Sequence, residues 1–444
     1  MQGEGLGWWG IVRLGLVQTA LGAIIVLTTS TLNRVMVVEL ALPAMLPGAL
    51  VAWHYALQIL RPRWGFGADA GRRSTPFIIG GMATLAVGGA LAAVATATMA
   101  SHVLLGAGLA ALAFTLIGAG VGAAGTSLLV LLAKRVAPRR RVPAATIVWL
   151  MMIAGFAVTA GTAGHFLDPF TLTRLVTITS IVSVLAFSLA VVAVWGLETS
   201  SVSVDAGRQA KRPKPDFRAA LAEVWAEPQA RLFSIFIFVS MLAYSAQDLI
   251  LEPFAGSIFG LTPGQSTQLS GLQNGGVFSG MVLIALIGSR FGTPQGWTIA
   301  GCIGSAAALV ALVVGGEVGQ GWPIAPTVYV LGFMNGVYAA SAIGSMMALA
   351  GAGKADREGT RMGVWGASQA IAFGLGGTLG TVAVDATRAV LGSPLSAYGS
   401  VFLAEALLFL VSAGLATRIA AQKIPARMRA EPSADLIAMA SGRG

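Results

Sequence analysis

The distribution of basic residues between long apolar runs constrains this 444-residue chain more than any other feature. Twelve runs are long enough to cross a hydrocarbon core of about 30 Å, which takes about 20 helical residues. Of the 28 Lys and Arg residues, only Arg34, Arg174 and Arg388 fall in the six turns that would lie on one side of the membrane. Basic residues are retained on the cytoplasmic side. The pattern predicts an all-α polytopic membrane protein with both termini in the cytoplasm.

A polar, basic stretch at 197–231 divides the runs into six and six. Its second part, 217–225, carries apolar residues at helical spacing and is typical of an amphipathic helix in the membrane interface. Two six-helix halves joined by a linker resemble the major facilitator architecture. The predicted parts are an N-terminal half at 1–196, a cytoplasmic linker with an amphipathic helix at 197–231, a C-terminal half at 232–420 and a cytoplasmic tail at 421–444. The predicted spans are 14–36, 42–60, 77–99, 103–132, 142–163, 173–195, 232–254, 267–287, 297–314, 324–350, 362–387 and 398–419.

Composition excludes several functional classes. Hydrophobic residues make up 56% of the chain and charged residues 10%, whereas soluble domains average about 25% charged residues. The net charge of +10 is explained by loops that face anionic lipid, so we expect membrane lipid rather than nucleic acid as a partner. Cys302 is the only cysteine, and the segments between the runs contain no hydrolase motif or phosphate-binding loop. We therefore expect no catalysis and no protein-bound metal.

The loop after the second run resembles the major facilitator loop signature, in which a glycine, three residues and an aspartate precede Gly-Arg-Arg. The corresponding residues here are Gly65, Asp69, Gly71, Arg72 and Arg73. The loop departs from the signature by one residue, because Gly71 follows Asp69 after a single position. We expect a cytoplasmic latch between the halves, with an ordinary basic loop as the alternative.

Polar residues at membrane depth are few and mark candidate sites. His54 follows Trp53 and lies one helical turn before Gln58. An imidazole among aromatic rings suits an axial ligand for a chlorin magnesium, and a structural histidine bonded to a neighbouring helix is the alternative. Further ligand-binding candidates are Asn33, Gln273, Asn274 and Gln369.

Asp248 and Glu252 in the seventh run are four residues apart and so share a helix face. A carboxylate at this depth needs a partner or a proton. Arg34 in the first outer turn, close to Glu39, is the expected partner of Asp248, because the first and seventh runs correspond in the two halves. The alternatives are a proton-coupling carboxylate and a structural or pigment-facing ion pair.

Four stretches resemble the PucC family, a major-facilitator-like group of photosynthetic bacteria and cyanobacteria. They are LTTSTLNRVMVVEL at 27–40, AQDLILEPF at 246–254, GLQNGG at 271–276 and RMGVWGASQA at 361–370. The compact chain is most similar to the branch labelled bacteriochlorophyll synthase chain. That label does not make the chain catalytic, because the chain shows no Asp-rich diphosphate motif.

The resemblance implies a membrane-embedded factor that binds and delivers bacteriochlorophyll or a late precursor during assembly of light-harvesting or photosynthetic complexes. It implies a tetrapyrrole pigment as ligand. Light-harvesting or reaction-centre polypeptides, or pigment-synthesis enzymes, are the expected protein partners. The expected location is the bacterial inner or photosynthetic membrane. The alternatives are a proton-coupled secondary transporter of a small solute and a non-catalytic subunit of a pigment-synthesis complex.

Overall fold

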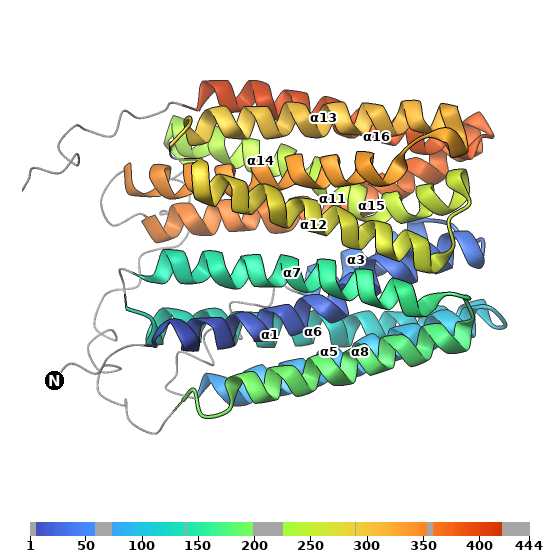
Figure 1. Cartoon of the computed structure of the whole chain (residues 1–444), viewed down its shortest axis with the longest axis horizontal. Helices are drawn as coiled ribbons and strands as arrows, with labels where there is room; N and C mark the ends of the chain where they lie inside the picture. The colour runs from blue at the N-terminus through green and yellow to red at the C-terminus, as the bar shows by residue number, and fades with distance from the viewer. Residues whose placement is uncertain are drawn as a thin grey trace, which may run out of the picture.

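The computed structural model describes residues 6–57, 73–137, 140–198, 225–288, 290–352 and 358–419. Within these ranges eleven helices are long and apolar enough to cross a membrane. The helix α3 (Met45–Leu57) corresponds to the remaining predicted span, 42–60. Residues 58–60 of that span lie outside the described ranges. The chain is a multi-pass membrane protein with the expected all-α architecture, drawn in Figure 1.

The first half begins with one continuous span at Trp8–Glu39, longer at both ends than the predicted 14–36. At its second end Leu27–Thr31 and Val35–Glu39 are π-helical and extend the span beyond Met36. The first-half elements are α1 (Trp8–Val26), η1 (Leu27–Thr31), α2 (Leu32–Arg34), η2 (Val35–Glu39), α3 (Met45–Leu57), α5 (Ser74–Met99), α6 (Val103–Arg135), α7 (Arg141–Leu167) and α8 (Leu172–Val194).

The second half begins at Pro228, where proline occupies the first helical turn, a position that suits its fixed φ and missing N–H. Its elements are α11 (Pro228–Phe259), α12 (Pro263–Ile287), α13 (Pro294–Val318), η5 (Gly319–Gly321), α14 (Ile324–Ala352), α15 (Glu358–Leu391) and α16 (Pro394–Arg418). The predicted amphipathic linker helix falls almost wholly on residues outside the described ranges.

Successive helices run in opposite directions, so the bundle has two ends (Figure 1). We call the end where α1 begins and α16 ends the terminal end, and the opposite end the distal end. Apart from α3, whose described part stops at Leu57, the helix starts and ends next to the basic segments lie at the terminal end (Figure 1). The Glu198 carboxylate fixes part of this end by accepting hydrogen bonds of 2.9 Å from the Ser74 and Thr75 amides, which cap the start of α5.

Each half has its own large apolar core, and the halves meet along several helix contacts. Helix α7 packs against α12, α3 packs against α15, and the second part of the first span packs against α11 and α12. In Figure 1, α5 and α8 lie at one edge of the bundle and α13 and α16 at the other. The middle of the molecule is therefore formed by elements from both halves.

Candidate functional site

The first span changes helical form where it meets the second half. The Thr28 hydroxyl donates to the carbonyl oxygens of Ile24 and Ile25, and the Thr29 hydroxyl donates to Ile25. Such back-bonds bend a helix, and π segments inside α-helices often mark functional sites. The π-helical turn at Leu27–Thr31 begins at this point. Its hydroxyl-rich sequence thus shapes the span along the contact between the halves.

Side-chain hydrogen bonds join the first span to the second half. The Ser30 and Ser270 hydroxyl oxygens lie 3.3 Å apart, and those of Thr31 and Thr267 lie 3.0 Å apart. The Asn33 amide, which was a ligand candidate, is buried and donates to the Leu249 carbonyl oxygen at 2.5 Å. These bonds link residues 27–40, one of the four stretches that resemble the PucC family, to the second half.

Arg34 lies in the same contact and is only 2% exposed. Its guanidinium forms an ion pair with Glu39 and donates to the Leu261 carbonyl oxygen at 2.6 Å. Gly256 makes room for it, because a Cβ at that position would lie 2.8 Å from the Arg34 Nη2 atom. The predicted pairing of Arg34 with Asp248 is wrong, since the ion-pair partner is Glu39.

Glu252 completes this polar contact, which we call the distal cluster and define as Ser30, Arg34, Glu39, Glu252 and Ser270. The Glu252 side chain is 2% exposed and interacts electrostatically with Arg34. Serine hydroxyls, including those of Ser30 and Ser270, surround its carboxyl group, but neither carboxyl oxygen has a hydrogen bond of normal geometry among the described residues. Glu252 is therefore a buried acid at the junction of the halves that shares one guanidinium with Glu39.

Two further carboxylates join the halves at the distal end. The Asp385 carboxylate of α15 accepts hydrogen bonds from the Ala44 and Met45 amides at 3.0 and 2.7 Å, at the start of α3. The Asp168 carboxylate, directly after α7, accepts from the Thr262 hydroxyl at 2.9 Å, at the start of α12. Both acids lie at helix N-termini of the opposite half, where negative charge is favoured. The halves are thus fastened together at the distal end.

Aromatic rings form a second cross-half contact near the middle of the bundle. The rings of His54 and Tyr55 lie 4.5 Å apart, those of Tyr55 and Phe373 5.9 Å, and those of Tyr244 and Phe373 6.0 Å. Asp248, one turn after Tyr244 on α11, interacts electrostatically with it. The chain of rings runs from α3 in the first half through α15 to α11.

Asp248 also interacts electrostatically with Glu405 of α16. Glu405 is 2% exposed, and neither of its carboxyl oxygens has a hydrogen-bond partner among the described residues. Asp248 itself is half-buried. We call Tyr55, Tyr244, Asp248, Phe373 and Glu405 the central cluster, which brings acidic and aromatic groups together at membrane depth.

Trp53 and His54 do not line one site. Trp53 is 49% exposed and donates from its indole nitrogen to the Thr115 hydroxyl at 2.9 Å, whereas His54 is 1% exposed. Successive residues of a helix point about 100° apart, which explains the separation. The His54 imidazole is therefore enclosed by protein in this conformation.

The remaining candidates are spread over the molecule. Gln273 is buried in α12, Asn274 donates to the Ser270 carbonyl oxygen at 3.0 Å, and Gln369 is half-buried in α15. Arg73 is exposed and directly precedes α5. The other members of the predicted site, Gln58 and the latch residues Gly65, Asp69, Gly71 and Arg72, lie outside the described residues.

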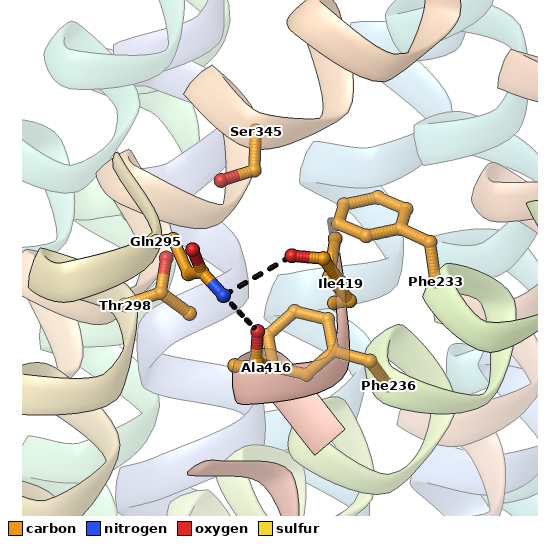
Figure 2. Close-up of a pocket in the computed structure, with 7 residues that line it drawn as sticks. All are labelled: Phe233, Phe236, Gln295, Thr298, Ser345, Ala416 and Ile419. Carbon is orange, nitrogen blue, oxygen red and sulfur yellow. Dashed lines mark hydrogen bonds between the residues drawn. The ribbon is translucent and has the colours of Figure 1, made fainter. Parts of the chain in front are cut away.

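A small pocket lies at the terminal end of the second half, between α11, α13, α14 and α16 (Figure 2). The Gln295 amide crosses it and donates to the carbonyl oxygens of Ala416 and Ile419 at 2.8 and 3.1 Å. These carbonyl groups lie at the end of α16, where intrahelical donors run out. The Gln295 side chain thus completes a helix end, and the pocket is a gap in helix packing.

Sequence reasoning missed Tyr244 and Phe373, and it left Glu405 outside the predicted site. The four-residue spacing of Tyr244 and Asp248 indicates a shared helix face and could have drawn attention to the tyrosine. No sequence signal places Phe373 or Glu405 beside them, because those residues come from α15 and α16.

Comparison with solved structures shows which known folds this architecture resembles. The nucleoside transporter NupG superposes with a TM-score of 0.66 at 14% identity, over 92% of this chain and 98% of that one. A bacterial homologue of the human lysosomal transporter Spinster, in an inward-facing and unoccupied conformation, gives 0.63 at 14% identity, over 94% and 98%. At this identity the likeness concerns the fold alone.

Sequence relatives identify the family. The Bacteriochlorophyll synthase 44.5 kDa chain of Rhodobacter capsulatus is 54% identical over 433 residues, which are 95% of this chain and 98% of that protein. Protein PucC of Rhodobacter capsulatus is 29% identical over 425 residues, 91% of each chain. The family model described as PUCC protein matches residues 31–424. The chain therefore belongs to the PucC family.

Proposed function

We propose that this protein binds bacteriochlorophyll or a late precursor within the membrane and delivers it during assembly of light-harvesting or other photosynthetic pigment–protein complexes. The observation that carries the proposal is the 54% identity, over nearly the whole chain, to a protein named as a bacteriochlorophyll synthase chain, joined to a fold of two facing six-helix halves. Such a fold offers a site between its halves at membrane depth.

Physical chemistry supports a lipophilic cargo. A pigment with a hydrocarbon tail needs large apolar and aromatic walls and few polar contacts. The described part of the molecule offers aromatic rings from both halves near its middle and only a few acids there. The halves are fastened at the distal end, which favours exchange of the cargo from the terminal end or sideways from lipid.

A non-catalytic role fits these residues better than an enzymatic one. Attachment of an isoprenoid tail from a diphosphate calls for acidic residues that hold divalent metal ions. The described residues contain no group of three or more metal-ligating side chains, and the sequence has no Asp-rich motif. In this proposal the protein works beside pigment-synthesis enzymes or pigment-binding polypeptides and catalyses no step itself.

A proton-coupled carrier of a small solute is the second candidate. It is favoured by Glu252, a buried acid at the junction of the halves whose oxygens lack regular hydrogen bonds from the described residues. Intramembrane acids at such junctions serve as proton relays in transporters. Proton movement into vesicles on addition of a solute, lost in Glu252→Gln, would support this candidate over the first.

Deletion of the gene in the native host tests the proposal. Assembly of one or more pigment–protein complexes should fall while the pigment itself is still made, because delivery is removed and synthesis is not. Restoration by the wild-type gene is the control. Unchanged complex levels in the deletion strain would contradict the proposal.

A further inference from the structure

We propose that Asp248 binds the central magnesium of a chlorin-type macrocycle that packs against the aromatic side chains of Tyr55, Tyr244 and Phe373. The inference rests on the proposed function, since it assigns a binding site to the pigment. It assigns the metal contact to a carboxylate on α11 in place of His54, a candidate ligand from sequence.

The aromatic part of the site comes from both halves. Phe373 of α15 lies 5.9 Å from the ring of Tyr55 on α3 and 6.0 Å from the ring of Tyr244 on α11. All three residues are half-buried. Aromatic side chains contribute large apolar contact areas, through their faces or their edges. A macrocycle placed here would contact both halves at once.

The acidic part of the site lacks a positive partner among the described residues. Asp248 interacts electrostatically with Glu405, a second acid, which is 2% exposed and has no hydrogen bond to its carboxyl oxygens from the described part of the chain. Arg34, the cation expected from sequence, is paired with Glu39 and interacts with Glu252. Buried carboxyl groups without a cation are costly. A ligand with a metal centre would supply the missing positive group.

Accessibility favours Asp248 over His54 as the magnesium ligand. Mg²⁺ is a hard cation that prefers oxygen ligands such as carboxylates. A macrocycle must also reach its ligand, and Asp248 is half-buried whereas His54 is 1% exposed. Glu405 is too deeply buried to meet a macrocycle, so Asp248 rather than Glu405 is assigned as the ligand.

Two pigments that differ in the central metal test the proposed contact between Asp248 and magnesium. Purified full-length protein in detergent is titrated with chlorophyll a, a magnesium chlorin, and with pheophytin a, which has the same tail but no metal. The wild-type protein should bind chlorophyll a more tightly. Asp248→Ala should weaken chlorophyll a binding roughly tenfold, equivalent to about 1.4 kcal/mol, and leave pheophytin a binding unchanged.

Two variants serve as comparisons. Tyr244→Leu should weaken both pigments alike, because it removes stacking and leaves the metal contact. Glu317→Gln, at an exposed acid near the distal end of α13, should change neither affinity. A monodisperse elution profile and a wild-type melting temperature for each variant establish that it has folded.

The outcomes separate the two proposals. Equal losses for chlorophyll a and pheophytin a in Asp248→Ala would overturn the metal contact while leaving pigment binding intact. A loss of metal preference in His54→Ala, with none in Asp248→Ala, would identify His54 as the ligand. Failure of the wild-type protein to bind either pigment would contradict the proposed function itself.

Discussion

Thr31 in the first span and Thr267 in α12 share a hydrogen bond of 3.0 Å between their hydroxyl oxygens, which joins the two halves near the distal end. Both side chains are fully buried. The contact belongs to the same junction as the distal cluster, so closure of this end depends on small polar side chains that approach one another closely.

Cysteine cross-linking tests this contact. With Cys302 replaced by Ala, Thr31→Cys and Thr267→Cys should form a disulfide on mild oxidation, because the two side chains meet at their γ atoms and bridged cysteines have Cβ atoms within about 4.5 Å of each other. The reaction is followed by mass spectrometry. Thr31→Cys with Ser279→Cys is the control, since Ser279 lies further along α12 by about 18 Å and should not react. Absence of the 31–267 disulfide would contradict a closed distal end.

Arg34 should be important for stability. Arg34→Gln leaves the buried acid Glu252 without its cation and should lower the free energy of unfolding by about 3 kcal/mol, the lower part of the range for a broken buried pair, since Glu39 is partly exposed. Unfolding in mixed micelles measures the change. Arg34→Gln combined with Glu252→Gln should lose less than the single variant, because the pair is coupled. A larger, additive loss would show that Glu252 does not depend on Arg34.

Neighbouring glycines of α12 offer a matched pair. A Cβ at Gly276 would overlap the Tyr329 carbonyl oxygen of α14, whereas a Cβ at Gly275 meets nothing within 4 Å. Gly276→Ala should destabilise the protein by about 1–3 kcal/mol through overpacking against a backbone that cannot move aside. Gly275→Ala should be neutral or stabilising by up to about 1 kcal/mol, because alanine favours the helix. Equal effects on the melting temperature would contradict the close approach of α12 and α14.

The orientation proposed from the basic residues can be tested by labelling. With Cys302 replaced by Ala, cysteines are placed at Ser101, exposed at the distal end, and at Arg290, exposed at the terminal end. A membrane-impermeant thiol reagent should label Ser101→Cys in cells with an opened outer membrane, and Arg290→Cys only after the inner membrane is disrupted. The reverse pattern would place both termini on the outside.

Hydropathy and loop charge predicted the fold class, because lipid leaves a spanning backbone few alternatives to the helix. They were less successful for the end of the first span. Its π-helical turns at Leu27–Thr31 and Val35–Glu39 bury Arg34, which sequence reasoning placed in an outer turn. Composition carries no signal for that extension, since it depends on contacts with α11 and α12.

The candidate site was predicted only in part. Their spacing correctly put Asp248 and Glu252 on one face of α11. The two acids lie one helical turn apart along the bundle, however, and so have different neighbours: Arg34 for Glu252 and Glu405 for Asp248. Sequence adjacency suggested a joint site for Trp53 and His54, yet helix geometry turns them apart. Contacts between distant helices, such as Tyr55 with Phe373, need the folded structure.

The absorption spectrum of the protein, purified in mild detergent from the membranes of its native host, tests pigment handling most directly. The account predicts bacteriochlorin bands that elute with the protein, at close to one pigment per chain. Colourless protein from cells that are making the pigment, in the same detergent that keeps pigment bound to their light-harvesting complexes, would contradict it.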